Sequence, residues 1–90
     1  MGMRRAHVVV RGLVQGVSFR VLACQRARSR ELGGWVRNRA DGAVEAVFEG
    51  REEAVMALVD WCRSGPPGAL VESVNVAWEP VQGEQGFAIR

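Results

Sequence analysis

Strand-like and helix-like hydrophobic patterns alternate along this chain in an order that few folds accommodate. Apolar residues alternate at period two over Ala6–Val10, which predicts a strand, and a helix-compatible run extends from Phe19 to about Glu31. Gly33-Gly34 is expected to end that helix. Two further strands are predicted at Trp35–Arg39 and Ala43–Glu49, joined by a hairpin turn at Ala40-Asp41-Gly42.

The second half of the chain adds another helix and further strands. Val55, Leu58, Val59 and Cys62 recur at helical spacing within Arg51–Arg63. Val71–Glu79 alternates again, and Phe87–Arg90 is compatible with a short final strand. The order β-α-β-β-α-β predicts a ferredoxin-like α+β fold, with a mostly antiparallel sheet and two helices on one face. This fold hosts many functions, so it indicates no activity by itself.

Size and composition predict one soluble domain that spans residues 1–90. The hydrophobic share is 48%, the charged share is 24% and the net charge is +2, which is too mild to indicate nucleic-acid binding. No apolar run reaches the ~20 residues that cross a bilayer, so we expect a cytoplasmic monomer without membrane contacts. The thiols Cys24 and Cys62 are expected to be buried and unpaired in a reducing compartment.

The segment Gly12–Arg20 has the composition of an anion-binding loop. It connects a predicted strand to a predicted helix, and a helix start offers unpaired N–H groups and the positive end of the helix dipole. Glycine lets the backbone approach a ligand closely, and Arg20 adds a forked, permanently charged donor. Ser18 is a candidate cap for the helix that begins near Phe19.

Several kinds of catalytic site are excluded by residues that the chain lacks. The single histidine, His7, has no ligand partner at metal spacing, and no Cys/His cluster or paired acidic motif indicates zinc or magnesium. The loop lacks the Gly-Lys-Ser/Thr ending of a P-loop, and the chain has no lysine. No Ser-His-Asp triad is indicated, and we expect neither a metal nor a cofactor.

An anion-binding loop without a metal, a P-loop lysine or a catalytic triad can still catalyse hydrolysis when the substrate has a good leaving group. Phosphoryl transfer requires mainly positioning and charge stabilisation, and a carboxylate leaving group needs no general acid. Asn38 is the best candidate to orient the attacking water, because an amide side chain is unfavourable within a strand unless it has a task. Taken singly, however, Arg20 is typical of a solvated surface, and Asn38 of a strand end before a turn.

Two motifs in this chain resemble the signatures of the acylphosphatase family. Val14-Gln15-Gly16-Val17, followed by Phe19-Arg20, resembles the phosphate-binding loop of that family. Gly34-Trp35-Val36-Arg37-Asn38, followed by Asp41-Gly42 and Val44-Glu45, resembles its second signature at the family's spacing. The resemblance covers nearly the whole chain. It implies hydrolysis of acyl phosphates to a carboxylate and inorganic phosphate, without metal or cofactor.

The resemblance also implies a role for each matching residue. Arg20 would bind the phosphoryl group together with the amides of the loop, and Asn38 would position the attacking water. The loop residues are Val14, Gln15, Gly16, Val17, Ser18 and Phe19. The chain departs from the family at Leu13, where a basic residue is common, and at Arg30 and Glu31, where the family often has an apolar residue and a glycine.

Two other functions fit the same fold. An RNA-binding module would stack bases on exposed sheet aromatics, but Phe48 and Trp78 alternate with valines, which places them on the core side. The half-buried or core positions expected for Trp35 and Trp61 also disfavour it. A non-catalytic phosphate sensor would keep the loop without turnover. The sequence indicates no second pocket for an acyl group, so it does not specify the acyl phosphate.

Overall fold

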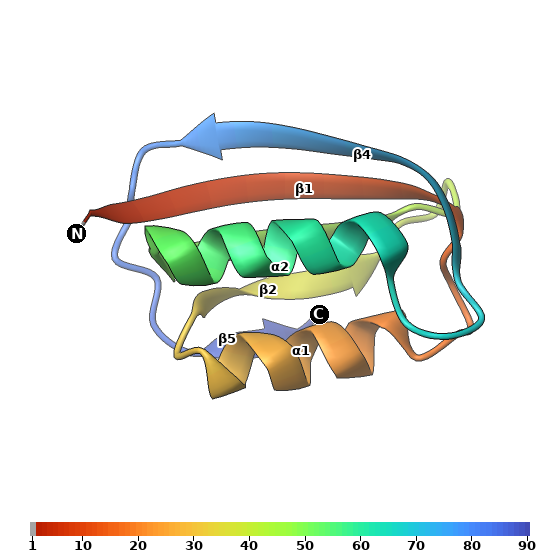
Figure 1. The fold of residues 1–90 in the computed structure, drawn as a ribbon, viewed down its shortest axis with the longest axis horizontal. Helices are drawn as coiled ribbons and strands as arrows, with labels where there is room; N and C mark the ends of the chain where they lie inside the picture. Colours follow the sequence, from red (N-terminus) through yellow and green to blue (C-terminus); the bar gives the residue numbers. More distant parts are fainter. Residues whose placement is uncertain (1) are drawn as a thin grey trace.

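The computed structural model describes residues 2–90 and contains five strands and two helices. In chain order these are β1 (Met3–Leu13), α1 (Phe19–Ser29), β2 (Gly33–Asn38), β3 (Val44–Arg51), α2 (Glu52–Ser64), β4 (Leu70–Glu79) and β5 (Phe87–Ile89). The strands form one sheet in the order β4-β1-β3-β2-β5, antiparallel except for the parallel pair β2 and β5. Both helices pack on the same face of the sheet (Figure 1). The predicted ferredoxin-like α+β fold is confirmed.

The core lies between the sheet and the two helices, where the sequence periodicity predicts it. Ala6, Val8 and Val10 of β1 are buried on the helix side. The predicted helical stripe of α2 is buried as well, and Phe48 of β3 stacks on Phe87 of β5 with ring centroids 5.5 Å apart. Residues at period two in strands and at period 3.6 in helices therefore meet in one layer.

The end of α1 differs from the expectation. The helix ends at Ser29, and Gly33 and Gly34 belong to β2 instead of ending the helix. The Leu32 N–H donates to the Ala27 carbonyl at 2.9 Å, and Glu31 has φ 58°. This is a Schellman end, in which the left-handed position usually holds glycine. Glu31 therefore adopts a conformation that disfavours a side chain.

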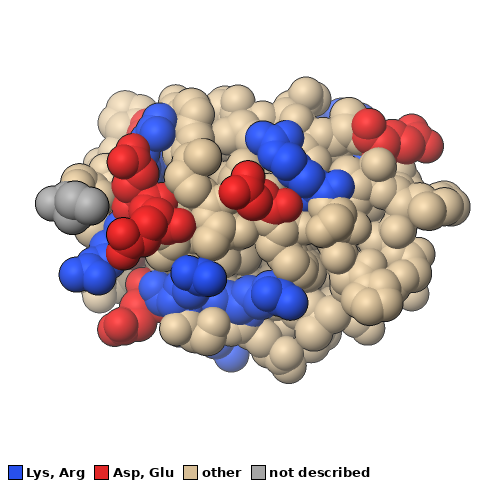
Figure 2. All heavy atoms as spheres, viewed as in Figure 1, with Lys and Arg blue, Asp and Glu red and all other residues tan. Residues whose placement is uncertain are grey.

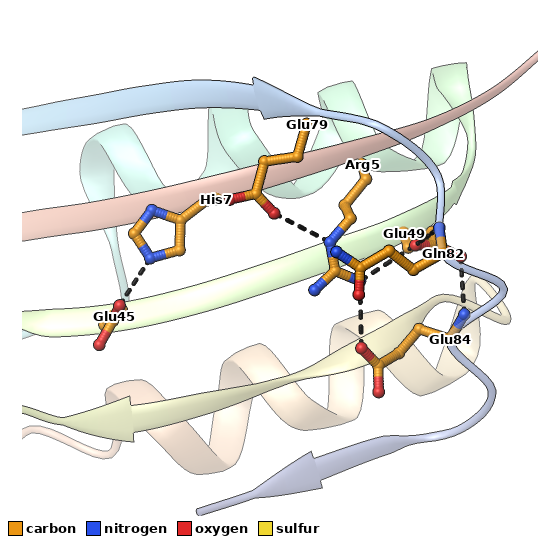
Figure 3. A network of polar contacts seen from close by, with 7 residues as sticks. All are labelled: Arg5, His7, Glu45, Glu49, Glu79, Gln82 and Glu84. Carbon is orange, nitrogen blue, oxygen red and sulfur yellow. Dashed lines mark hydrogen bonds and ion pairs between the residues drawn. The ribbon is translucent and has the colours of Figure 1, made fainter.

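A buried ion-pair network covers part of the sheet face that the helices leave open. The Arg5 guanidinium lies 3.0 Å from the Glu49 carboxylate, 2.9 Å from Glu79 and 3.0 Å from Glu84 (Figure 3). Glu49 also accepts hydrogen bonds from the N–H groups of Gln82 and Glu84. These contacts hold the segment between β4 and β5 against the sheet, so that β5 can begin beside β2.

The network also explains why charged residues are tolerated inside the sheet. Burial alone would raise the pKa of Glu49, but hydrogen bonds from the Gln82 N–H and from Arg5 outweigh it and hold that pKa below its ordinary value. Burial likewise opposes the charge on Arg5, and its bonds to the three carboxylates raise its pKa. Glu45 and Glu49 lie on the sheet face opposite the core, and their sequence context gives no sign that both are buried.

Trp78 was expected on the core side, and it does lie on that face, opposite Ala6 of β1, but it is not buried. It is 42% exposed, and the Arg4 guanidinium stacks 3.6 Å from its ring centroid. Trp78 lies near the end of β4, an edge strand in which no residue is fully buried. Trp35 and Trp61 are half-buried, as expected.

The two cysteines are buried and free, as expected. Burial raises the pKa of the Cys62 thiol to about 12, so it has little tendency to ionise. Neither helix in residues 2–90 has the length and hydrophobicity needed to cross a membrane.

The left-handed Glu31 leads to a stability prediction. Glu31→Gly should raise the free energy of unfolding by about 1 kcal/mol, because glycine adopts a positive φ without a Cβ clash. Urea unfolding should show a higher midpoint with an unchanged slope. Arg30→Gly is the control, since Arg30 has φ −103° and glycine there only adds freedom to the unfolded chain. If both variants are destabilised equally, Glu31 is not strained.

Candidate functional site

The chain between β1 and α1 forms a tight loop at the end of the central strands. Val14 and Phe19 are buried and anchor its two ends. Gly16 and Ser18 adopt left-handed backbone conformations, with φ 76° and 61°. The Ser18 side chain makes no capping hydrogen bond, so its expected role as a helix cap is wrong. Because its φ is positive, Ser18 turns the chain into the helix rather than capping it.

The loop presents a row of backbone N–H groups. Among residues 2–90, none accepts a hydrogen bond from the backbone N–H groups of residues 15–21. The last three of these groups belong to the first turn of α1, where no partner exists within a helix. The same turn carries the positive end of the helix dipole. The loop therefore has the donors that an anion needs.

Arg20 and Asn38 line one small hollow at this loop. The hollow has a volume of about 70 Å³. Its lining residues are Val14, Gly16, Ser18, Phe19, Arg20, Val21 and Asn38. Gln15 and Val17 of the expected loop are not among them. Val21 was not anticipated from the sequence, and its place in the first turn of α1 is the only signal that would have suggested it.

The sheet register explains how two distant segments meet here. Val10 of β1 is paired with Val44 of β3, and Val44 is paired with Asn38 of β2. These three residues lie side by side across the sheet, just before the loop leaves β1. Asn38 is thereby held at the level of the loop by backbone hydrogen bonds.

Neither Arg20 nor Asn38 is engaged by another side chain. Arg20 forms no ion pair within residues 2–90, although many other arginines of the chain do. The carboxamide of Asn38 likewise makes no hydrogen bond to these residues, and it is only partly buried. Both polar groups are free to contact a ligand.

The Gln15 side chain ties the loop to the turn between β2 and β3. Its Nε2 donates to the Arg39 carbonyl at 2.8 Å and to the Ala43 carbonyl at 3.0 Å. The turn is also braced by Asp41, which accepts from the Ala43 N–H at 3.1 Å and pairs with Arg11 at 3.2 Å. The sequence places Gln15 in the loop but does not predict these hydrogen bonds, because the Arg39 and Ala43 carbonyls are far from Gln15 in the sequence.

Phe19 fixes the start of α1 against the second helix. Its ring centroid lies 5.1 Å from that of Trp61 on α2. Gly65, just after α2, has φ 68°, and a Cβ there would lie only 3.0 Å from the Phe19 ring. The position of Arg20, the next residue, therefore depends on this packing.

The charges on the helix face and at the end of the molecule opposite the loop are of both signs. Figure 2 shows acidic side chains beside several of the basic ones on the helix face, and one short run of basic side chains in the lower half of the view. A larger hollow of about 620 Å³ lies at the other end of the molecule, between the end of α1 and the start of α2. Its arginines are accompanied by Glu31 and Glu53, and Arg51 lies 3.7 Å from the Glu53 carboxylate. Within residues 2–90, no group of three His, Cys, Asp or Glu side chains is arranged to hold a metal ion.

Comparison with known proteins gives a consistent result. A family model for acylphosphatase matches residues 6–89. An acylphosphatase of Chloroflexus aurantiacus is 55% identical over 87 residues, covering 97% of this chain and 95% of the relative. An acylphosphatase of Roseiflexus sp. (strain RS-1) is 56% identical over 90 residues, covering 99% and 97%. The crystal structure of acylphosphatase from Bacillus subtilis superposes with a TM-score of 0.92 at 36% identity, covering 97% of this chain and 98% of that one. The chain therefore belongs to the acylphosphatase family.

Proposed function

We propose that this member of the family hydrolyses acyl phosphates without metal or cofactor, using Arg20 and the loop N–H groups to bind the phosphoryl group and Asn38 to orient water. The observation that carries the proposal is the shared hollow, in which Arg20, Asn38 and the loop meet. The expected substrate is a small acyl phosphate, and the products are a carboxylate and inorganic phosphate.

The phosphoryl group would be bound by two kinds of donor. The free N–H groups of the loop would donate hydrogen bonds to its oxygens, and the unpaired Arg20 guanidinium would add a positive charge. These donors stabilise the charge spread over the equatorial oxygens during phosphoryl transfer. Arginine suits this role because its planar fork contacts two oxygens at once.

Asn38 would hold the attacking water in line with the leaving group. The water oxygen forms a bond to phosphorus while the bond between phosphorus and the acyl oxygen breaks, and the electron pair leaves with the carboxylate. The proton of the water passes to a phosphoryl oxygen, so no protein base is required. An amide is adequate because its task is orientation rather than proton transfer.

The proposal also covers the domain organisation, oligomeric state and location of the enzyme. We expect one domain, a monomer, that works in the cytoplasm and does not bind nucleic acid. The mixed charges in Figure 2 support the last point, and the free thiols Cys24 and Cys62 are compatible with a reducing compartment.

The Arg20 role predicts a large loss of catalysis on substitution. Arg20→Ala should lower kcat/KM for acetyl phosphate by roughly 10²–10³-fold and abolish competitive inhibition by inorganic phosphate. Arg30→Ala, at the other end of α1, is the control and should match the parent. Rates are measured with EDTA present, because a loss of parental activity on chelation would contradict the metal-free mechanism. Phosphate binding without any turnover would identify a sensor instead.

The Asn38 role predicts a separation of binding from turnover. Asn38→Ala should lower kcat by roughly 10²-fold and leave inhibition by phosphate nearly unchanged, because the contact is made to water. Asn75→Ala, on the exposed part of β4, is the matched control. A loss confined to KM would show that Asn38 binds substrate rather than water.

The Gln15 contacts predict a positioning effect that acts through Asn38. Gln15→Leu removes both donors to the β2–β3 turn and should lower kcat about tenfold, with little change in phosphate inhibition. In an Asn38→Ala background the same substitution should add almost nothing, since the group being positioned is gone. Gln25→Leu, an exposed position on α1, serves as control. If the losses in kcat from Gln15→Leu and Asn38→Ala instead multiply in the double variant, Gln15 does not act through Asn38.

A further inference from the structure

A second hollow, which the sequence does not indicate, lies on the sheet face that the helices leave open and shares Asn38 with the hollow at the loop. It has a volume of about 520 Å³ and is lined by Trp35, Arg37, Asn38, Glu45 and Arg90. Asn38 lines both hollows, so an acyl group would pass the end of β2 at Asn38 to reach the second one on the other sheet face. The phosphoryl hollow is much smaller, at about 70 Å³, and leaves the acyl group to be placed outside it.

The charged side chains in this second hollow differ in whether they already have a partner of opposite charge. Arg37 is held by Glu45, with its Nη2 2.6 Å and its Nε 2.7 Å from Oε1. The other oxygen of Glu45 contacts His7 Nε2 at 2.6 Å (Figure 3). Burial would raise the pKa of Glu45, but the bonds from His7 and Arg37 outweigh it and lower that pKa. Both oxygens of the charged Glu45 are therefore already engaged by His7 and Arg37.

Arg90 is the charge in the hollow that is left without a partner. It forms no ion pair with any of residues 2–90. Its backbone is fixed, because its N–H donates to the Val36 carbonyl at 2.9 Å beyond the β2–β5 pairing. Its guanidinium lies 4.9 Å from the ring centroid of Trp35, which orients the cation over the indole.

We infer that this second hollow is a subsite for the acyl group, selective for acyl chains that end in a carboxylate. The inference rests on the proposed function, since it starts from a phosphoryl group bound at Arg20. The carbon chain would lie against the half-buried Trp35, and the terminal carboxylate would be bound by the fork of Arg90. Arg37 shields this carboxylate from the negative charge of Glu45.

The test compares two acyl phosphates of equal chain length. Succinyl phosphate carries a terminal carboxylate where butyryl phosphate carries a methyl group, and the readout is the ratio of their kcat/KM values. The parent should favour succinyl phosphate, and Arg90→Gln should lower the ratio about fivefold to tenfold. Arg90→Lys should restore only part of it, because lysine keeps the charge but not the fork.

Arg51→Gln is the matched control, since it removes one exposed arginine at the other end of the molecule. It should leave the ratio at the parental value, which separates local binding from the general attraction of an anion. An unchanged ratio in Arg90→Gln, or an equal fall in Arg51→Gln, would overturn the subsite. Failure of the parent to hydrolyse butyryl phosphate would instead overturn the proposed function, so the two failures are distinguishable.

Discussion

The pairing of β1 with β3, and of β3 with β2, is the constraint on which the rest of this structure depends. The register aligns Val10, Val44 and Asn38, so the point where β1 enters the loop and the point where β2 ends lie at one level. A shift by one residue would turn Asn38 to the opposite sheet face, away from the loop. The alternation of β1 fixes the register, because Ala6, Val8 and Val10 must face the helices.

Much of the fold was predictable because it follows from local patterns. The alternation of β1, the apolar stripe of α2 and the turn at Asp41-Gly42 each specify an element without knowledge of its partners. The ends of elements were less predictable. A Schellman end with Glu31 at the left-handed position looks, in sequence, like a helix that continues to the next glycines. Ser18 has the composition of a cap, yet its positive φ prevents that role.

Long-range polar contacts could not be predicted from the chain at all. Glu49 looks like an exposed strand residue until Arg5 and the segment after β4 close over it. Gln15 has the sequence context of a phosphate-binding loop, but its side chain contacts the β2–β3 turn. The partners in both cases are far away in sequence, and only the sheet order brings them together. The two family-like motifs contain Arg20 and Asn38, and the register explains why these residues meet.

The central claim is that the loop at residues 15–21, which includes Arg20, is where phosphate binds. A titration of the ¹⁵N-labelled protein with inorganic phosphate, followed by amide NMR, tests it most directly. The account predicts the largest shifts at the loop amides and at the Arg20 side chain, because free N–H groups gain an acceptor there. Shifts concentrated instead around Arg30 and Arg51, in the large hollow at the other end, would contradict it.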